Sequence, residues 1–220
     1  MNRKIITTAD GSNTIHIKDW NEQYHSKHGA IQEAYHVFIK QGLGLFNNQE
    51  ISILEVGFGT GLNALITLIE IQNLKLDVRY RGVEAYPIST EELQQLNYIS
   101  KLKAGSFKKQ FLRMHQSAWE EEVKIFDNFN LYKQQSDFKD ITDENTFNLI
   151  YFDAFGARVQ PELWTENIFS IMYKALKKNG ILVTYSAKGS VRRAMQTVGF
   201  TVERLPGPIG KREMLRAVKP

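Results

Sequence analysis

Residues 54–63, LEVGFGTGLN, place three glycines within five positions directly after an apolar run. That run, ISILEV (51–56), predicts a buried parallel strand. The residues after the glycines, LNALITLIEIQNL (62–74), carry apolar side chains at helical spacing. Glycine lets the backbone adopt positive φ and lets a ligand approach it closely. The stretch therefore predicts a strand-to-helix turn that meets a ligand, although tight turns of this kind also occur where no ligand binds.

The spacing of the glycines indicates the ligand. They are Gly57, Gly59 and Gly61, and Glu55 stands two residues before the first of them. A dinucleotide site of the pattern G-x-G-x-x-G needs a glycine at position 62, which is Leu62 here. A P-loop needs a Lys-Ser/Thr pair after its last glycine, and none follows. The pattern G-x-G-x-G instead resembles the first motif of S-adenosylmethionine-dependent methyltransferases, so S-adenosylmethionine is the expected cofactor.

Strands and helices alternate through the rest of the chain. Strands are expected at 76–84, 123–135 (with a hairpin at Asp127-Asn128), 147–153, 181–187, 200–207 and 212–218, and helices at 88–102, 167–180 and 190–199. Such alternation predicts a mostly parallel sheet with helices on both faces. The last two strands are joined by the short loop PGPIG and must be antiparallel. The expected fold is α/β and Rossmann-like, of the methyltransferase type: a mostly parallel seven-stranded sheet whose last strand is antiparallel.

The segment before the first of these strands has a different character. Residues 1–48 are expected to form a small N-terminal extension on the substrate side. It would consist of a hairpin in KIITTADGSNTIHI (4–17) and a helix in GAIQEAYHVFIKQG (29–42). Residues 49–220 are then expected to form the Rossmann-like domain.

Carboxylates follow several of the expected strands, and ligands of such sheets bind at the carboxyl ends of strands. Glu84 ends the strand after the glycine turn, where it can accept hydrogen bonds from both ribose hydroxyls. Asp137 follows the next strand region and can meet the adenine amino group. Each residue alone also fits a solvated loop carboxylate. Together with the glycines, in this order, they favour S-adenosylmethionine.

A third carboxylate carries the expected chemistry. Asp153 leaves a buried strand at the same edge and is followed by the aromatic Phe155. An N-methyltransferase must hold an amine with its lone pair free, and a carboxylate can orient that amine and accept its proton. The alternative is that Asp153 only caps the turn that follows its strand.

Composition excludes several classes of protein. The chain has 220 residues and no cysteine, which excludes disulfides, a thiolate zinc site and a cysteine nucleophile within it. It has no apolar run of about 18 residues, and MNRKIITTADGS (1–12) lacks a signal-peptide core, so a cytoplasmic protein without a membrane contact is expected. The five histidines form no metal-binding pattern, and no metal is expected. Three of them, His25, His28 and His36, lie close enough in sequence to supply one histidine to the site.

The net charge of +4 is unevenly distributed. Eight cations fall between residues 188 and 219: Lys188, Arg192, Arg193, Arg204, Lys211, Arg212, Arg216 and Lys219. Residues 119–144 lean acidic instead. Two solvated faces of opposite sign are one interpretation, and an RNA-facing basic patch is the other.

Further stretches carry a resemblance to a known family: HGAIQEAYHVF (28–38), YFDAFGARVQPELWTENIF (151–169), VRRAMQTVGF (191–200) and GPIGKREML (207–215). With LEVGFGTGLN they resemble, in the family's order, the methyltransferase domain of the bifunctional tRNA 5-methylaminomethyl-2-thiouridine biosynthesis proteins. The resemblance runs from about residue 7 to residue 220. It implies N-methylation of 5-aminomethyl-2-thiouridine at the wobble position in the anticodon region of tRNA.

The same resemblance implies roles for individual residues. The cofactor would be bound by Glu55, Gly57, Gly59, Gly61 and Asn63 along the turn, by Glu84 at the ribose and by Asp137 at the adenine. Asp153 would be the catalytic residue at the target amine. Substrate would be bound by Glu33, Phe155, Lys211 and Arg212.

The family's larger members also carry a flavin-dependent oxidase domain, for which the 220 residues hold no sequence. A stand-alone methyltransferase is therefore expected, supplied with its aminomethyl substrate by other wobble-uridine-modifying enzymes. Two alternatives remain from the sequence. One is a methyltransferase or aminopropyltransferase-like enzyme acting on a small-molecule amine, and the other is a non-catalytic RNA-binding Rossmann-like module.

Overall fold

The computed structural model of the chain describes residues 2–220, which form two sheets. The smaller sheet holds β1 (Arg3–Thr7), β2 (Asn13–Ile17) and β3 (Glu22–Gln23). The larger holds β4 (Glu50–Val56), β5 (Asp77–Val83), β6 (Glu122–Phe126), β7 (Phe129–Gln134), β8 (Phe147–Phe152), β9 (Leu176–Thr184), β10 (Thr201–Pro206) and β11 (Glu213–Val218). Its strand order is β10-β11-β9-β8-β4-β5-β7-β6.

The large sheet confirms the α/β, Rossmann-like prediction. The central strands β9, β8, β4, β5 and β7 are parallel to their neighbours within this group, and β11 runs antiparallel between β9 and β10. The predicted number of strands is wrong: the sheet has eight strands, not seven. The extra one is β6, which the turn at Asp127-Asn128 folds back against β7 as an antiparallel edge strand.

The helices fall into longer and shorter elements. The α-helices are α1 (Ala30–Ala34), α2 (Leu62–Leu74), α3 (Thr90–Gln94), α4 (Tyr98–Lys101), α5 (Lys108–Gln116), α6 (Glu166–Ala175) and α7 (Gly189–Thr197). The others are η1 (Lys18–Trp20), the π-helix η2 (Tyr35–Lys40), η3 (Leu43–Leu45), η4 (Gly105–Phe107), η5 (Phe138–Asp140) and η6 (Pro161–Trp164). No helix among residues 2–220 combines the length and the apolar character needed to cross a membrane.

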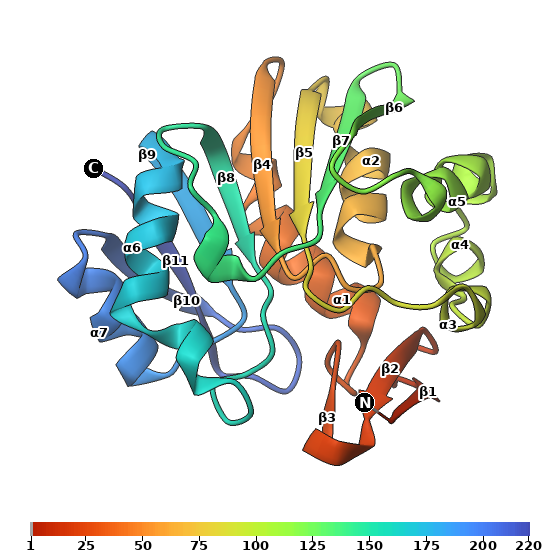
Figure 1. Cartoon of the computed structure of the whole chain (residues 1–220), viewed down its shortest axis with the longest axis horizontal. Helices are drawn as coiled ribbons and strands as arrows, with labels where there is room; N and C mark the ends of the chain where they lie inside the picture. The colour runs from red at the N-terminus through yellow and green to blue at the C-terminus, as the bar shows by residue number, and fades with distance from the viewer. Residues whose placement is uncertain (1) are drawn as a thin grey trace.

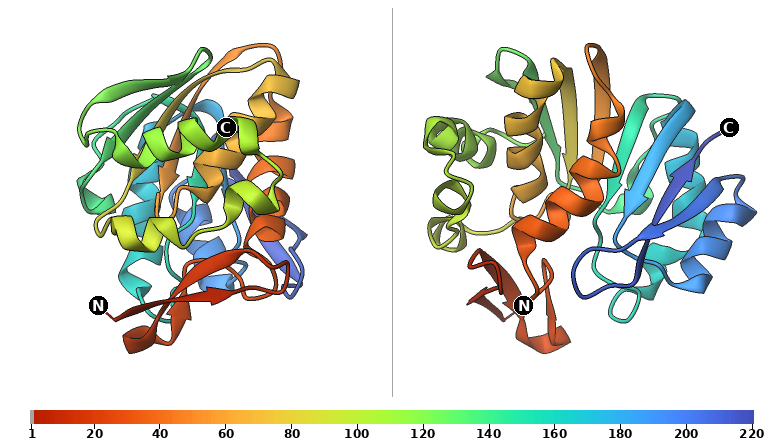
Figure 2. Two further views of the ribbon diagram at one scale, coloured as in Figure 1. Left: turned by 90° about the vertical axis from the view of Figure 1, so that its right-hand side faces the viewer. Right: turned by 180° about the vertical axis from the view of Figure 1, so that it is seen from behind.

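Helices cover both faces of the large sheet (Figures 1 and 2). On one face, α1, η2 and α2 bury an apolar core that includes Phe38, Leu65 and Tyr151, and α4 and α5 extend it with Tyr98 and Phe111. On the other face, α6 and α7 pack on β8 and β9 and bury a second apolar core, which includes Phe152, Phe169, Leu182 and Met195. Because β4 and β8 are covered on both faces, their sequences read as nearly continuous apolar runs.

The small sheet lies at the end of the large sheet where the central parallel strands finish (Figure 1). β1 and β2 pair antiparallel in the register Arg3↔Ile17 to Thr7↔Asn13, which is the hairpin expected for residues 4–17. The helix expected at 29–42 begins at Ala30 as α1 and continues as η2 to Lys40. The hairpin and the helix therefore frame the same edge of the large sheet as the glycine turn.

Two predicted helices differ in the structure for identifiable reasons. The helix expected at 88–102 begins with the capping box of Ser89 and Glu92, but divides into α3 and α4. Between them, the Asn97 side chain donates to the Gly11 carbonyl (2.9 Å) and accepts from the Asn13 amide (2.7 Å) of the β1–β2 hairpin. The helix expected at 167–180 ends at Ala175, because Leu176 is extended and pairs with Phe147 of β8. Helix α5 was not expected from the sequence.

Candidate active site

A cavity of about 390 Å³ opens at the carboxyl ends of β4, β5 and β8. Its volume lies in the range of ordinary small-molecule sites. The sequence-predicted residues that line it are Glu55, Gly57, Gly59, Asn63, Glu84, Asp137, Asp153 and Phe155. Gly61, Glu33, Lys211 and Arg212 do not line it.

The three glycines of the turn have positive φ angles of 94°, 48° and 70°. A Cβ atom at Gly57 would lie 2.7 Å from the Asp153 carbonyl oxygen, and one at Gly59 would lie 3.0 Å from the Tyr24 ring. A Cβ atom at Gly61 would lie 2.8 Å from His115 Nε2. Glycine is thus required by the backbone angle and by close neighbours within the protein. The turn was expected to admit a ligand; it also brings three separate segments of the chain against it.

Glu84 is anchored to the glycine turn. Its Oε2 accepts a hydrogen bond from the Gly59 amide (2.9 Å), and its Oε1 accepts one from the Tyr86 amide (2.9 Å). Burial raises the pKa of Glu84, while these two amides and the charge of Arg3 lower it. Each carboxylate oxygen has a second lone pair, so the group keeps the capacity to accept two more donors.

The floor of the cavity holds a buried hydrogen-bond network of three side chains, those of Glu55, Asn63 and Asp153. The Asn63 amide nitrogen donates to Glu55 Oε1 (2.9 Å) and to Asp153 Oδ2 (2.9 Å), and the Tyr80 hydroxyl donates to Glu55 Oε2 (2.8 Å). Asn63 Oδ1 is buried and accepts no hydrogen bond from residues 2–220. Asn63 Oδ1 is therefore an unused acceptor on the same amide whose nitrogen joins the two carboxyl groups.

Both carboxyl groups of this network, those of Glu55 and Asp153, have raised pKa values and so hold a proton more readily than usual. Burial raises the pKa of Glu55 well above its usual value, against the opposing hydrogen bonds from Tyr80 and Asn63. Burial, assisted by the charge of Glu33, raises the pKa of Asp153 to about 7, while Asn63 and Lys211 act to lower it. Asp153 consequently changes its charge near neutral pH, which is a property expected of a general base.

Glu33 and Lys211 meet each other next to the cavity. Lys211 Nζ donates to Glu33 Oε1, and the second Glu33 oxygen accepts from the Ser26 amide (2.9 Å). Lys211 Nζ also lies 3.9 Å from the centroid of the Tyr185 ring, whose hydroxyl donates to the Ala154 carbonyl (2.8 Å). This ion pair joins α1 to the β10–β11 loop and influences Asp153 by charge. Arg212 is exposed beside it.

An aromatic wall closes the side of the cavity that faces the small sheet. The Phe155 ring packs edge-on against Trp20 (5.4 Å between centroids) and against Tyr24 (4.9 Å). Arg158 ties the loop of Phe155 to the small sheet by donating to the Trp20 and Asn21 carbonyls and to Glu22. The sequence does not identify Trp20 and Tyr24 as site residues. The only available signal was two aromatic residues within a short polar segment.

Asp137 and His25 are among the other residues that line the cavity. Asp137 accepts a hydrogen bond from the Lys139 amide (3.1 Å), and its side chain stays 44% exposed at the cavity rim. His25 Nδ1 lies 2.9 Å from the Thr14 hydroxyl, and removal from water lowers its pKa to about 4. His25 is the histidine of the 25–36 group that reaches the cavity. Residues 2–220 hold no cluster of three potential metal ligands among histidine and carboxylate side chains.

Half of the eight cations between 188 and 219 are engaged within the protein. Lys211, Arg204 and Arg216 pair with Glu33, Glu213 and Glu203, and Lys219 donates to the Leu176 carbonyl. The remaining four are Lys188, Arg192, Arg193 and Arg212, and the described chain shows no ion pair for them. Arg192 and Arg193 lie on α7, which follows the carboxyl end of β9.

The glycine turn, the acidic residue that ends the next strand and the antiparallel β11 together define a Rossmann-like methyltransferase. The chain belongs to the family of S-adenosyl-L-methionine-dependent methyltransferases, whose model matches residues 95–220. This family assignment confirms S-adenosylmethionine as the cofactor.

Individual relatives refine the similarity. The chain is 29% identical over 217 residues to the tRNA 5-methylaminomethyl-2-thiouridine biosynthesis bifunctional protein MnmC of Leptospira interrogans, which covers 90% of this chain and 32% of that protein. The crystal structure of MNMC2 from Aquifex aeolicus superposes with a TM-score of 0.80 and 27% identity, covering 100% of this chain and 70% of that one. These matches confirm the resemblance to the methyltransferase domain of the MnmC family. The chain spans about a third of the length of the curated relatives it matches.

A more distant likeness concerns the fold alone. Spermidine synthase from Thermotoga maritima superposes with a TM-score of 0.57 at 13% identity, covering 95% of this chain and 69% of that one.

Proposed function

We propose that the chain methylates the primary amine of 5-aminomethyl-2-thiouridine at the wobble position of tRNA, giving 5-methylaminomethyl-2-thiouridine. The observation that carries the proposal is the acidic floor of the cavity, where Glu55 and Asp153 flank Asn63 beside the glycine turn. A primary alkylamine is a cation at neutral pH, and the ionised form of Asp153, whose pKa is about 7, would hold it. The nucleoside is taken from the name of the curated MnmC relatives, which refers to 5-methylaminomethyl-2-thiouridine biosynthesis in tRNA.

The residues present fit S-adenosylmethionine. The unused acceptor Asn63 Oδ1 suits the ammonium group of its methionine part, and the free lone pairs of Glu84 suit its ribose hydroxyls. Asp137, at the rim, would accept from the adenine amino group. When bound, the cofactor supplies an electrophilic methyl group on a sulfonium sulfur, and S-adenosylhomocysteine and a proton leave with the methylated amine.

Asp153 would prepare the amine for attack. An ammonium group has no free lone pair, so it must give up a proton before its nitrogen can bond to the methyl carbon. With a pKa of about 7, Asp153 can accept that proton and orient the amine. Phe155, Trp20 and Tyr24 would pack against the uracil ring and exclude water from the amine.

The proposal is tested with tRNA that carries the unmethylated aminomethyl group. The purified chain, isotopically labelled S-adenosylmethionine and this tRNA are incubated, and the nucleosides are analysed by mass spectrometry. Label should appear in the wobble nucleoside. Spermidine and putrescine are tested in parallel, because they represent the small-amine alternative. Rapid methylation of these amines with inert tRNA would contradict the proposal, and so would an absence of transfer to every amine.

We expect the tRNA to contact the end of the sheet near α7. The double variant Arg192→Glu/Arg193→Glu should weaken tRNA binding at least about tenfold and reduce the log–log salt slope by about 1.4 to 1.8, because each lost phosphate contact is worth about 0.7 to 0.9. Binding measured across a salt series gives both values.

The matched control is Lys108→Glu/Lys109→Glu, a tandem pair of exposed cations on α5 at the opposite side of the molecule (Figure 1). This control changes the net charge equally and should have a much smaller effect. Equal effects of the two double variants would show that net charge, not the α7 surface, governs binding.

A further inference from the structure

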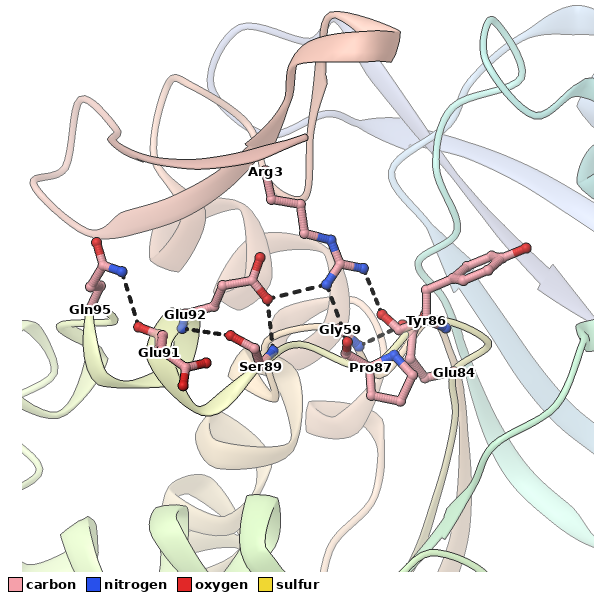
Figure 3. Close-up of polar contacts among 9 residues, drawn as sticks. All are labelled: Arg3, Gly59, Glu84, Tyr86, Pro87, Ser89, Glu91, Glu92 and Gln95. Atoms are coloured by element: carbon pink, nitrogen blue, oxygen red, sulfur yellow. Dashed lines mark hydrogen bonds and ion pairs between the residues drawn. The ribbon is translucent and has the colours of Figure 1, made fainter. Parts of the chain in front are cut away.

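Arg3, the first residue of β1, connects the small sheet to the loop that follows β5. Its guanidinium donates to the Tyr86 carbonyl (2.7 Å), to the Pro87 carbonyl (3.2 Å) and to Glu92 Oε2 (3.2 Å), as Figure 3 shows. The side chain is only 13% exposed. Hydrogen bonds from a charged donor in a shielded place are among the stronger ones in proteins.

The loop that Arg3 holds is the one that fixes Glu84. Tyr86 accepts from Arg3 through its carbonyl and donates to Glu84 Oε1 through its amide (2.9 Å). The other Glu84 oxygen is held by the Gly59 amide (2.9 Å), as Figure 3 also shows. One residue of backbone therefore separates the guanidinium from the carboxylate that faces the cavity. A shift of the loop would rotate the Glu84 carboxylate away from its present orientation.

Arg3 also lies close to Tyr24, a member of the aromatic wall of the cavity. Its guanidinium carbon lies 5.7 Å from the centroid of the Tyr24 ring. That ring packs over Gly59, where a Cβ atom would lie 3.0 Å from it. The positive charge of Arg3 lowers the pKa of Glu84 and so opposes the effect of burial. Arg3 thus contributes both position and charge at one end of the cavity, although it does not line the cavity itself.

We propose that Arg3 is a positioning residue for cofactor binding: through the Tyr86–Pro87 backbone it holds the Glu84 carboxylate in the orientation that accepts the ribose hydroxyls of S-adenosylmethionine. The inference rests on the proposed role of Glu84 and is independent of the identity of the methyl acceptor. It gives the small N-terminal sheet a function in cofactor affinity, in addition to its place beside the substrate.

The test compares Arg3→Met with Lys4→Met. Methionine retains much of the arginine stem and removes its donors, whereas Lys4 is the exposed neighbour on the same strand. Arg3→Met should raise the dissociation constant of S-adenosylhomocysteine, measured by calorimetry, by about tenfold or more, because it removes charge-assisted hydrogen bonds. Lys4→Met should leave it unchanged. Arg3→Lys keeps the charge but not the planar fork, so its effect should be intermediate.

A double-mutant cycle separates positioning of Glu84 from general support of the fold. In a Glu84→Gln background the carboxylate is already absent, so Arg3→Met should cost much less affinity than in the wild type. The methylation rate at saturating cofactor should change less than about twofold in Arg3→Met, as for a loss of uniform binding. If Arg3→Met does not fold, Arg3→Lys is carried through the same cycle.

Two results would overturn the inference: an unchanged dissociation constant in a folded Arg3 variant, or an equal penalty in both backgrounds. Neither result involves tRNA, so neither bears on the proposed substrate. Conversely, the Arg3 variants could change cofactor affinity as expected while the wild type leaves tRNA unmethylated. That result would refute the proposed function alone.

Discussion

Replacing Asp153 with asparagine should lower the rate of methyl transfer by about 10²- to 10⁴-fold, the usual contribution of a positioned general base. The amide is nearly isosteric, so the end of β8 and the Phe155 ring should stay in place. The variant would lose the carboxylate that, in the proposed function, accepts the proton of the alkylammonium. A carboxylate also raises the pKa of a nearby amine, so its benefit must come from positioning and from accepting the proton during transfer.

The pH dependence gives this prediction a second signature. The pKa of Asp153 is raised to about 7, so the active carboxylate form is gained as the pH rises through that value. The single-turnover rate of the wild type should increase over the same range, and the Asn variant should lack that transition. Parallel titration with cofactor should show a change in dissociation constant at least about tenfold smaller than the change in rate.

Asp137→Asn is the matched control, because it makes the same carboxylate-to-amide change at the rim of the same cavity. It should weaken cofactor binding and largely spare the rate at saturating cofactor, the reverse of Asp153→Asn. If Asp153→Asn methylates tRNA at nearly the wild-type rate, Asp153 is only a cap for its turn. The base would then be sought at His25, which lines the cavity.

Gly59→Val should abolish cofactor binding, with an increase in dissociation constant of at least about 100-fold. The φ angle at Gly59 is 48°, which a β-branched residue tolerates poorly. The new side chain would also start 3.0 Å from the Tyr24 ring. Both effects would displace the amide that donates to Glu84. Calorimetry with S-adenosylmethionine measures the loss, and NAD should not bind to either protein.

Gly105→Val is the control for this substitution. Gly105 has no positive φ, and a Cβ atom there would meet no atom of the described residues within 4 Å. It should fold and bind the cofactor as the wild type does, and circular dichroism would establish the folding of both variants. If Gly59→Val binds the cofactor with wild-type affinity, the cofactor does not bind at the glycine turn.

The parts of the site that the sequence predicted are those set by local rules. Gly57, Glu84 and Asp153 each follow a parallel strand, and the carboxyl ends of such strands meet at one edge, so the sequence alone predicts that they lie close together. The strand pairing Val56↔Phe152 then places Gly57 against Asp153. The capping box at Ser89 was predictable for the same reason, since its partners are three residues apart.

The missed parts depend on contacts between distant segments. Arg3 meets Tyr86 across 83 positions, and Glu33 meets Lys211 across 178, so neither pairing leaves a local pattern. The family resemblance assigned Glu33 and Lys211 to substrate but did not reveal that they pair with each other. The sequence does not reveal the eighth strand, because β6 and β7 form one continuous β-rich stretch and their pairing depends on the turn at Asp127-Asn128.

The position of β11 between β9 and β10 has a consequence for the order of folding. β10 comes earlier in the chain, yet within the described part of the chain it pairs with β11 alone. During synthesis β10 therefore has no strand to pair with until β11 has been made. Until then β9 is an open edge of the sheet, to which other chains can pair. The two strands should dock together as a hairpin once both have left the ribosome. Because Lys211 lies in the loop of that hairpin, its ion pair with Glu33 can form only at this late step.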